Sequence, residues 1–219
     1  MHESFKITCY PLNRYINVSI HLPKDYNETG RYYPVIYFLD GQNVFNEKDS
    51  FNGKSLELEN TVEKLKDEGK EAIYITIASA SNPDKRLEEY KEPTLANFII
   101  KSIHPYLLTR YRMNNYIYSF GCGLSALNAL TLNKSDIFKG AILLSPEADI
   151  NLISDLNLSN DKLYYIYTGQ KELDGSCKIL ANGIKKILPS TTIVCDDNTI
   201  HDESAWKDKV YDALNFLIL

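Results

Sequence analysis

The chain has 219 residues, 44% of them hydrophobic, so it is long enough to bury the core of one domain. Its formal net charge is −5 and its lysines are interspersed with acidic residues, which excludes the basic stripe typical of proteins that bind nucleic acids or acidic membranes. We therefore expect residues 1–219 to form a single domain that binds a small molecule and no nucleic acid.

Two sequence features bear on the compartment. The N-terminal segment MHESFKITCYPL lacks a basic stretch followed by an apolar one, and no run approaches the roughly 18 apolar residues that span a membrane. We expect a cytoplasmic protein that contacts no membrane. The four cysteines (9, 122, 177 and 195) should then stay reduced, and neither they nor the four histidines have the spacing of a metal site. We expect no disulfide, no metal and no cofactor; the sequence does not indicate an oligomeric state.

The chain begins with two segments that read as strands, 5–10 and 15–22. In the second, Ile16, Val18 and Ile20 alternate with polar residues, as in a half-buried antiparallel strand. Together they predict a hairpin at one edge of a sheet.

Continuous apolar runs and helical patterns then alternate along the chain. The apolar runs, which are typical of central parallel strands, lie at 35–39, 73–78, 116–118, 141–144, 163–167 and 191–195. The helical patterns lie at 58–65, 95–111, 122–132, 177–188 and 205–217. We expect 43–55, 79–93 and 147–161 to be irregular. Eight strands, two antiparallel and then six parallel, with helices on both faces, predict an α/β-hydrolase fold.

Residues 116–126, YIYSFGCGLSA, join the fifth strand to a helix. In this fold a nucleophilic serine stands on that sharp turn, usually within G-x-S-x-G. Ser119 is our candidate nucleophile, because Gly121 lies two residues after it, although Ile117 stands where the first glycine is expected. The Phe120 amide would then be one oxyanion donor.

The other expected functional residues follow later strands. Glu172 and Asp174 come after the seventh strand and His201 after the eighth, so the chain order is serine, acid, histidine, as this fold requires. Either carboxylate could orient the histidine, or could instead cap the helix that opens near Gly175. His201 precedes the last helix, for which residues 202–204 offer an N-cap.

Several segments resemble the putative-esterase family of α/β-hydrolases, which includes enterochelin-esterase-like enzymes and is related to the esterase D group. They are YPVIYFLDGQNVF (33–45), RLEEY (86–90), IFKGAILLSP (137–146), GQKE (169–172) and HDESAW (201–206). The resemblance implies cofactor-free hydrolysis of carboxylic esters by a serine. It matches His201 to the catalytic histidine, Glu172 to the acid, and the amides around Gly41 and Gln42 to the oxyanion loop.

The resemblance leaves the nucleophile open. An ungapped alignment downstream puts Phe120 on the nucleophile position, and one extra residue in the turn restores Ser119. Cys122 is a further thiol between glycines, but we expect it to be a buried helix residue. Arg86 and Glu89 form either a surface ion pair or part of the substrate cleft.

The leading functional hypothesis is hydrolysis of a small acyl ester by a triad of Ser119, His201 and Glu172 or Asp174. Thioesterase or peptidase activity would use the same triad. The alternative is a degraded α/β-hydrolase relative with a binding or scaffold role, since function depends on the site and not on the fold.

Overall fold

The computed structural model describes residues 1–197 and 200–218. Its strands are β1 (His2–Cys9), β2 (Arg14–His21), β3 (Tyr33–Leu39), β4 (Ile73–Ile77), β5 (Met113–Cys122), β6 (Gly140–Leu144), β7 (Leu163–Gly169) and β8 (Thr192–Asp196). They form one sheet in the order β1-β2-β4-β3-β5-β6-β7-β8. The pairs β1–β2 and β2–β4 are antiparallel and the others parallel, which confirms the predicted α/β fold.

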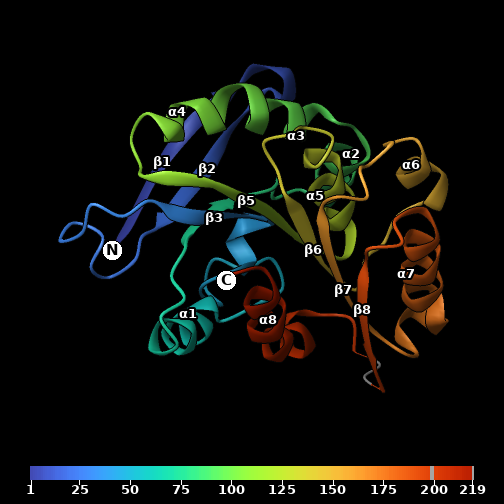
Figure 1. Ribbon diagram of the computed structural model, residues 1–219. Coiled ribbons are helices and arrows are strands. Elements are labelled where there is room, and N and C mark those ends of the chain that lie inside the picture. The colour runs from blue at the N-terminus through green and yellow to red at the C-terminus, as the bar shows by residue number, and fades with distance from the viewer. Residues whose placement is uncertain (198–199, 219) are drawn as a thin grey trace.

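Helices cover both faces of the sheet (Figure 1). They are α1 (Leu58–Asp67), α2 (Pro83–Lys91), α3 (Thr94–Phe98), α4 (His104–Leu108), α5 (Ala126–Leu132), α6 (Ile150–Ser154), α7 (Ser176–Ile187) and α8 (Glu203–Leu217). A π-helical turn, Ile99–Ile103, joins α3 to α4. The helices α1 and α8 lie on one side of the sheet and α2 to α7 on the other (Figure 1).

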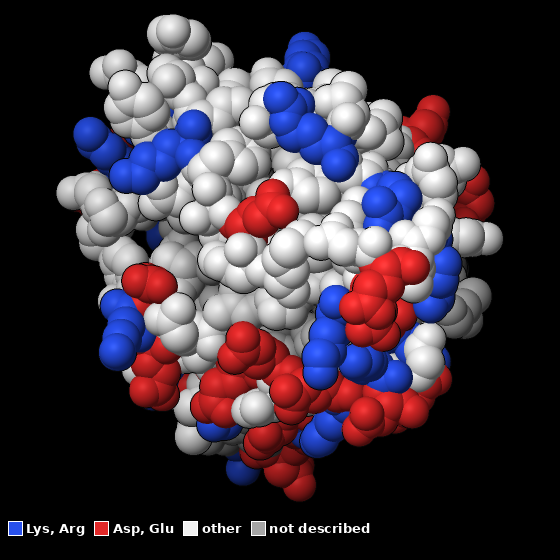
Figure 2. Space-filling view, turned by 90° about the vertical axis from the view of Figure 1, so that its left-hand side faces the viewer, with Lys and Arg blue, Asp and Glu red and all other residues white. Residues whose placement is uncertain are grey.

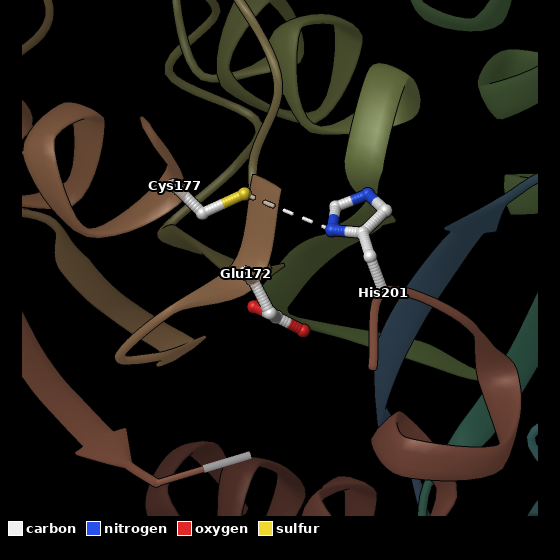
Figure 3. A group of neighbouring side chains, drawn as sticks. All are labelled: Glu172, Cys177 and His201. Atoms are coloured by element: carbon white, nitrogen blue, oxygen red, sulfur yellow. Dashed lines mark hydrogen bonds between the residues drawn. The ribbon is translucent and has the colours of Figure 1, made fainter. Parts of the chain in front are cut away.

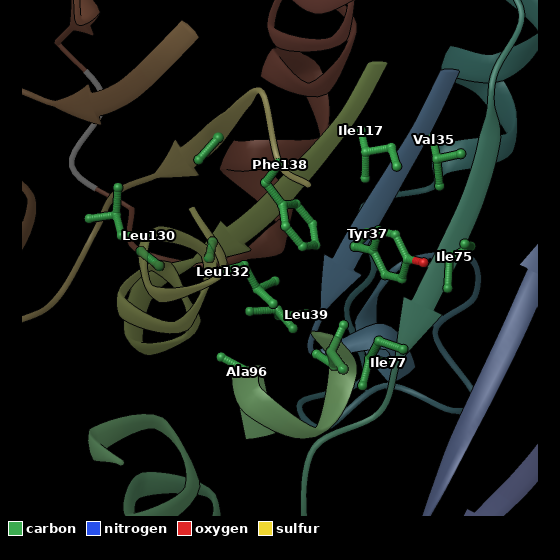
Figure 4. Packing of buried hydrophobic residues seen from close by; sticks show 14 of the residues in the cluster. Val35, Tyr37, Leu39, Ile75, Ile77, Ala96, Ile117, Leu130, Leu132 and Phe138 are labelled. Carbon is green, nitrogen blue, oxygen red and sulfur yellow. The ribbon is translucent and has the colours of Figure 1, made fainter. Parts of the chain in front are cut away.

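Alternation along the strands produces two apolar cores. In β3, Tyr37 and Leu39 face the layer of α3, α5 and α7, whereas Ile36 and Phe38 face α1 and α8. Figure 4 shows the first of these cores, with Tyr37 beside Phe138 and between the side chains of neighbouring strands. Because successive side chains of a strand point to opposite faces, the apolar runs had to be buried on both sides.

Several predicted segments differ from the structure, among them the helix expected from 122, which begins at Ala126. Strand β5 continues to Cys122, well past 118, and this moves the following turn along the chain. Helix α2 forms inside 79–93, which we expected to be irregular: Asn82 Oδ1 accepts a hydrogen bond from the Lys85 amide, and Pro83 occupies the first helical position. Helix α6 likewise lies inside 147–161.

Charges of both signs share the surface. On the face that Figure 2 shows, lysines and arginines stand among acidic side chains, and acidic residues gather in its lower part. Within the described residues, no helix has the length and apolarity needed to cross a membrane.

Candidate active site

The sharp turn of this fold follows Cys122, at the end of β5. Residues 121–125 read G-C-G-L-S, and Gly123 has a positive φ of 52°. A Cβ on Gly121 would lie 2.6 Å from the Ser125 carbonyl oxygen, so the close approach of strand and helix permits only glycine there. The Ser125 hydroxyl accepts from the Cys122 amide and donates to the Cys122 carbonyl, which ties the turn together. The elbow is therefore centred on Gly123.

The predicted histidine faces this glycine. A Cβ on Gly123 would lie 3.3 Å from His201 Nε2 and 3.1 Å from Glu147 Oε1. His201 Nε2 donates to Glu147 Oε1 over 2.8 Å. Position 123 is thus where a nucleophilic side chain would meet His201, and glycine supplies none.

His201 is held on both edges of its ring. Its Nδ1 lies 3.7 Å from Cys177 Sγ, and its ring packs edge-on against Trp206. Burial alone lowers the pKa of His201, but the hydrogen bonds with Cys177 and Glu147 outweigh it and raise the pKa above the usual 6.5. Because a carboxylate oxygen accepts, the proton shared with Glu147 is on Nε2. The expected N-cap of α8 is confirmed, because Asp202 Oδ1 accepts from the Ser204 amide.

A small cavity of about 130 Å³ opens beside the elbow. Arg86 lines it and donates to both carboxylate oxygens of Asp40, over 2.8 and 2.5 Å. Glu89 instead pairs with Arg14. Arg86 and Glu89 therefore do not pair with each other, and Arg86 lines the cavity.

The cavity wall combines polar and apolar side chains, and burial shifts the pKa of two of its groups. The carboxyl of Glu203 accepts a 2.6 Å hydrogen bond from Asn43, yet its burial raises its pKa. Burial and the nearby carboxylates of Glu203 and Asp40 raise the pKa of Cys122 well above its usual value. The expectation of a buried helix residue is wrong, because Cys122 ends β5, is half-buried and lines the cavity. Its raised pKa disfavours a reactive thiolate.

The prediction that Ser119 stands on the elbow is wrong. Ser119 lies within β5, is fully buried, and is not among the residues with positive φ. Its hydroxyl donates to the Ala129 carbonyl over 2.8 Å and accepts from Asn133 Nδ2. The alternative, Phe120, is equally buried and stacks on Phe38 within the sheet, so its amide is not at the turn. The error arose because the small residues after Tyr118 resemble a turn but continue a buried strand.

We expect Ser119→Ala to leave any ester hydrolysis within about twofold of wild type, because the hydroxyl does not reach the cavity. The unfolding free energy should fall by about 1 kcal/mol, since Asn133 and the Ala129 carbonyl lose a buried partner. Urea denaturation and steady-state assays of the same preparations check both points. A large loss of activity without loss of stability would show that Ser119 takes part in catalysis.

The two acid candidates, Glu172 and Asp174, differ in burial. Glu172 is fully buried, and its Oε2 accepts from Ser145 Oγ over 2.6 Å and from the Gly169 amide over 2.7 Å. Asp174 is exposed. The group that faces His201 Nδ1 is the Cys177 thiol, and neither carboxylate takes that place.

The expected oxyanion loop is built differently from the prediction. The cavity is lined by Asp40 and Asn43, whereas Gly41 and Gln42 line a separate hollow beside β1 and β2. The Gln42 side chain is bonded to Ser79 and Asp40 and fixes the loop. A Cβ on Gly41 would lie 2.7 Å from the Ile77 amide nitrogen, so this glycine is required for packing against β4.

Three residues of the site were missed. Residues 121–125 follow G-x-S-x-G if glycine replaces its serine and serine replaces its last glycine. A search for a serine at the central position does not find Gly123. Glu147 and Cys177 carry no local signal. The backbone amide of Glu147 donates to the Gly123 carbonyl, a contact that only the fold creates.

Comparisons with known proteins agree with this architecture. The model of the family described as "Putative esterase" matches residues 10–214. No curated protein sequence matches the chain. A ferulic acid esterase superposes with a TM-score of 0.75 at 16% identity, over 100% of this chain and 98% of that one.

Two further solved structures share the fold. An IroE-like serine hydrolase from Shewanella oneidensis has a TM-score of 0.73 at 15% identity, with coverage of 100% and 80%. The enterobactin esterase FES from Shigella flexneri, solved in the presence of enterobactin, has a TM-score of 0.81 at 14% identity. The match covers 99% of this chain and 58% of that one. The family match supports an enzyme of the ester hydrolase class, and the chain belongs to the putative esterase family.

Proposed function

We propose that this protein hydrolyses a small carboxylic ester by direct attack of water, without an acyl-enzyme on the elbow residue. One observation carries the proposal. A side chain at position 123 would begin 3.3 Å from His201 Nε2, but residue 123 is glycine and has no hydroxyl or thiol to acylate. Ser119, the serine expected to replace it, is enclosed in the sheet.

Glu147 is the group best placed to activate water. Its carboxylate stands above Gly123, is 37% exposed, and is held by the 2.8 Å hydrogen bond from His201 Nε2. As water attacks the ester carbonyl, Glu147 takes its proton, and the tetrahedral oxyanion forms next to the Leu124 amide that follows the elbow. Collapse then breaks the ester bond, and the proton passes from Glu147 to the leaving alkoxide. The products are a carboxylic acid and an alcohol.

The cavity favours a short substrate. Its volume of about 130 Å³ is below the roughly 300 Å³ at which pockets for larger ligands begin. Polar side chains such as Arg86, Asn43 and Glu203 line it together with apolar ones such as Phe51 and Trp206. A short acyl group matches this volume.

The test is Glu147→Gln, which keeps the shape of the side chain and a hydrogen-bond acceptor for His201 but removes the base. We expect kcat for a short p-nitrophenyl ester to fall about 100-fold, with KM nearly unchanged. Asp155→Asn is the matched control, because it removes one exposed carboxylate at the end of α6, outside the cavity. Intact-mass analysis of quenched wild-type reactions should show no acyl adduct. An adduct, or full activity of Glu147→Gln, would contradict the proposed mechanism.

A second function is favoured by the same carboxylate. Because Glu147 Oε1 lies 3.1 Å from the Cβ position of residue 123, it also fills part of the space in which an attacking group would stand. A family member of this form would bind acyl compounds without turnover. Titration calorimetry with a short-chain ester separates the two functions: binding without hydrolysis supports this second one and overturns the first.

A further inference from the structure

A second chemical cluster lies on the far edge of the His201 ring. Cys177 in the first turn of α7 and His201 before α8 point toward one another, and Glu172 on the turn after β7 lies beside them (Figure 3). Their ligand atoms, a carboxylate oxygen, Sγ and Nδ1, all lie within 4.8 Å of one another. The proposed water attack involves Nε2 of His201, whereas this cluster involves Nδ1 of the same ring.

One carboxylate oxygen of Glu172 is buried and, among the described residues, unpaired. The residue is fully buried, and within the described part of the chain its Oε1 has no hydrogen-bond partner. Its other oxygen is already paired with Ser145 and Gly169. A buried carboxylate with an open oxygen is costly unless a cation or a proton compensates it.

The donor set matches a transition metal. Thiolate, imidazole and carboxylate are the ligands of Zn²⁺, at about 2.3, 2.0 and 2.1 Å. At those lengths a tetrahedral ion separates its sulfur and nitrogen ligands by about 3.6 Å. The observed separation of Cys177 Sγ and His201 Nδ1 is 3.7 Å. Small side-chain rotations would bring the carboxylate oxygen to the same ion.

We propose that Glu172, Cys177 and His201 Nδ1 bind one divalent transition-metal ion of the Zn²⁺ type. Binding releases the thiol proton of Cys177, and the two anionic ligands then balance the charge of the ion in the buried site. The ion takes the Nδ1 lone pair, so the imidazole proton stays on Nε2. This agrees with the donation from Nε2 to Glu147. The ion would thus fix the orientation of the His201 ring and keep Nε2 a hydrogen-bond donor.

The spacing of cysteines and histidines along the sequence did not predict this site. The sequence suggested that the two residue types do not cluster, and the fold corrects this for Cys177 and His201, which are 24 residues apart. The Glu172 ligand comes from a third segment.

Metal binding can be measured without any activity assay. Reduced full-length protein, treated with EDTA and desalted, is titrated with Co²⁺ while the thiolate-to-cobalt charge-transfer absorption is recorded. Zn²⁺ is then added to displace Co²⁺. We expect saturation at one equivalent, loss of the band on addition of Zn²⁺, and a higher melting temperature of the Zn²⁺-loaded protein.

Variants identify the ligands. Cys177→Ser should abolish the charge-transfer band, and Glu172→Gln should weaken binding at least about 10-fold. Cys195→Ser and Asp174→Asn are matched controls, because Cys195 and Asp174 are exposed and outside the cluster, and both should bind like wild type. Circular dichroism establishes that each variant is folded. Should Glu172→Gln not fold, Cys177→Ser and Cys177→Ala decide the matter.

Three results would overturn the proposal. They are the lack of a stoichiometric charge-transfer band in wild type, a band that persists in folded Cys177→Ser, and binding that only Cys195→Ser removes. None of these results depends on ester hydrolysis, so failure of the metal site and failure of the proposed activity are distinguishable.

Discussion

Gly123→Ser combined with Glu147→Ala should create a serine that reacts with fluorophosphonates, whereas wild type should not be labelled. The elbow already has the positive φ of a nucleophile turn, and a Cβ at position 123 lies 3.3 Å from His201 Nε2. Removing Glu147 clears the oxygen 3.1 Å away and removes one group that raises the pKa of His201. In protein treated with EDTA, where no ion occupies Nδ1, Nε2 can then take the proton of the new serine.

Gel fluorescence and peptide mapping after labelling check this expectation. Gly123→Ala with Glu147→Ala adds the same bulk without a hydroxyl and should stay unlabelled. Ser119→Ala in the labelled background should change nothing, whereas His201→Ala should slow labelling at least about 100-fold. Labelling of wild type at Ser119 would refute the elbow assignment. A folded double variant that resists the reagent would show that His201 is not poised to act as a base.

Asp40→Asn should lower the unfolding free energy by about 3 kcal/mol, because it leaves the Arg86 guanidinium without its buried counter-charge. Asp40 and Arg86 are 6% and 19% exposed, and Tyr90 adds a 2.8 Å hydrogen bond to the carboxylate. Asparagine is chosen because Asp40 has a φ of 53°, a left-handed conformation that asparagine tolerates. Urea denaturation measures the loss. Glu71→Gln, which breaks the ion pair with exposed Arg31, should stay within about 1 kcal/mol of wild type.

The same pair predicts a pH dependence. Burial alone raises the pKa of Asp40, but the hydrogen bonds and charge of Arg86 outweigh it and hold the pKa below its usual value of 3.8. The contribution of the pair is therefore complete above about pH 4 and is lost as the pH falls through the folded-state pKa. The stability difference between wild type and Asp40→Asn should shrink in that acidic range. A difference that stays constant down to the folded-state pKa would mean that charge is not its cause.

Local sequence patterns were sufficient to predict the strands of the sheet and their buried faces. Alternation in β2 and continuous apolar runs in β3, β4 and β6 follow from which faces of each strand are buried, and that requirement can be read from neighbouring residues. The end of β5 could not be read this way. Ser119 lies against Asn133, and Gly121 lies against the backbone of Ser125, so both positions require small residues. Those contacts depend on the helix that follows.

The sequence by itself determined the eight-stranded α/β sheet, the cap of α8 and the place of His201 after the last strand, because each depends on periodicity or on residues a few positions apart. Only the tertiary structure decided what faces His201. Gly123, Glu147 and Cys177 come from three separate connections at one end of the sheet, and they meet through packing between layers. The chemistry at the elbow depends on those meetings, so a residue type found near the expected strand end could not establish it.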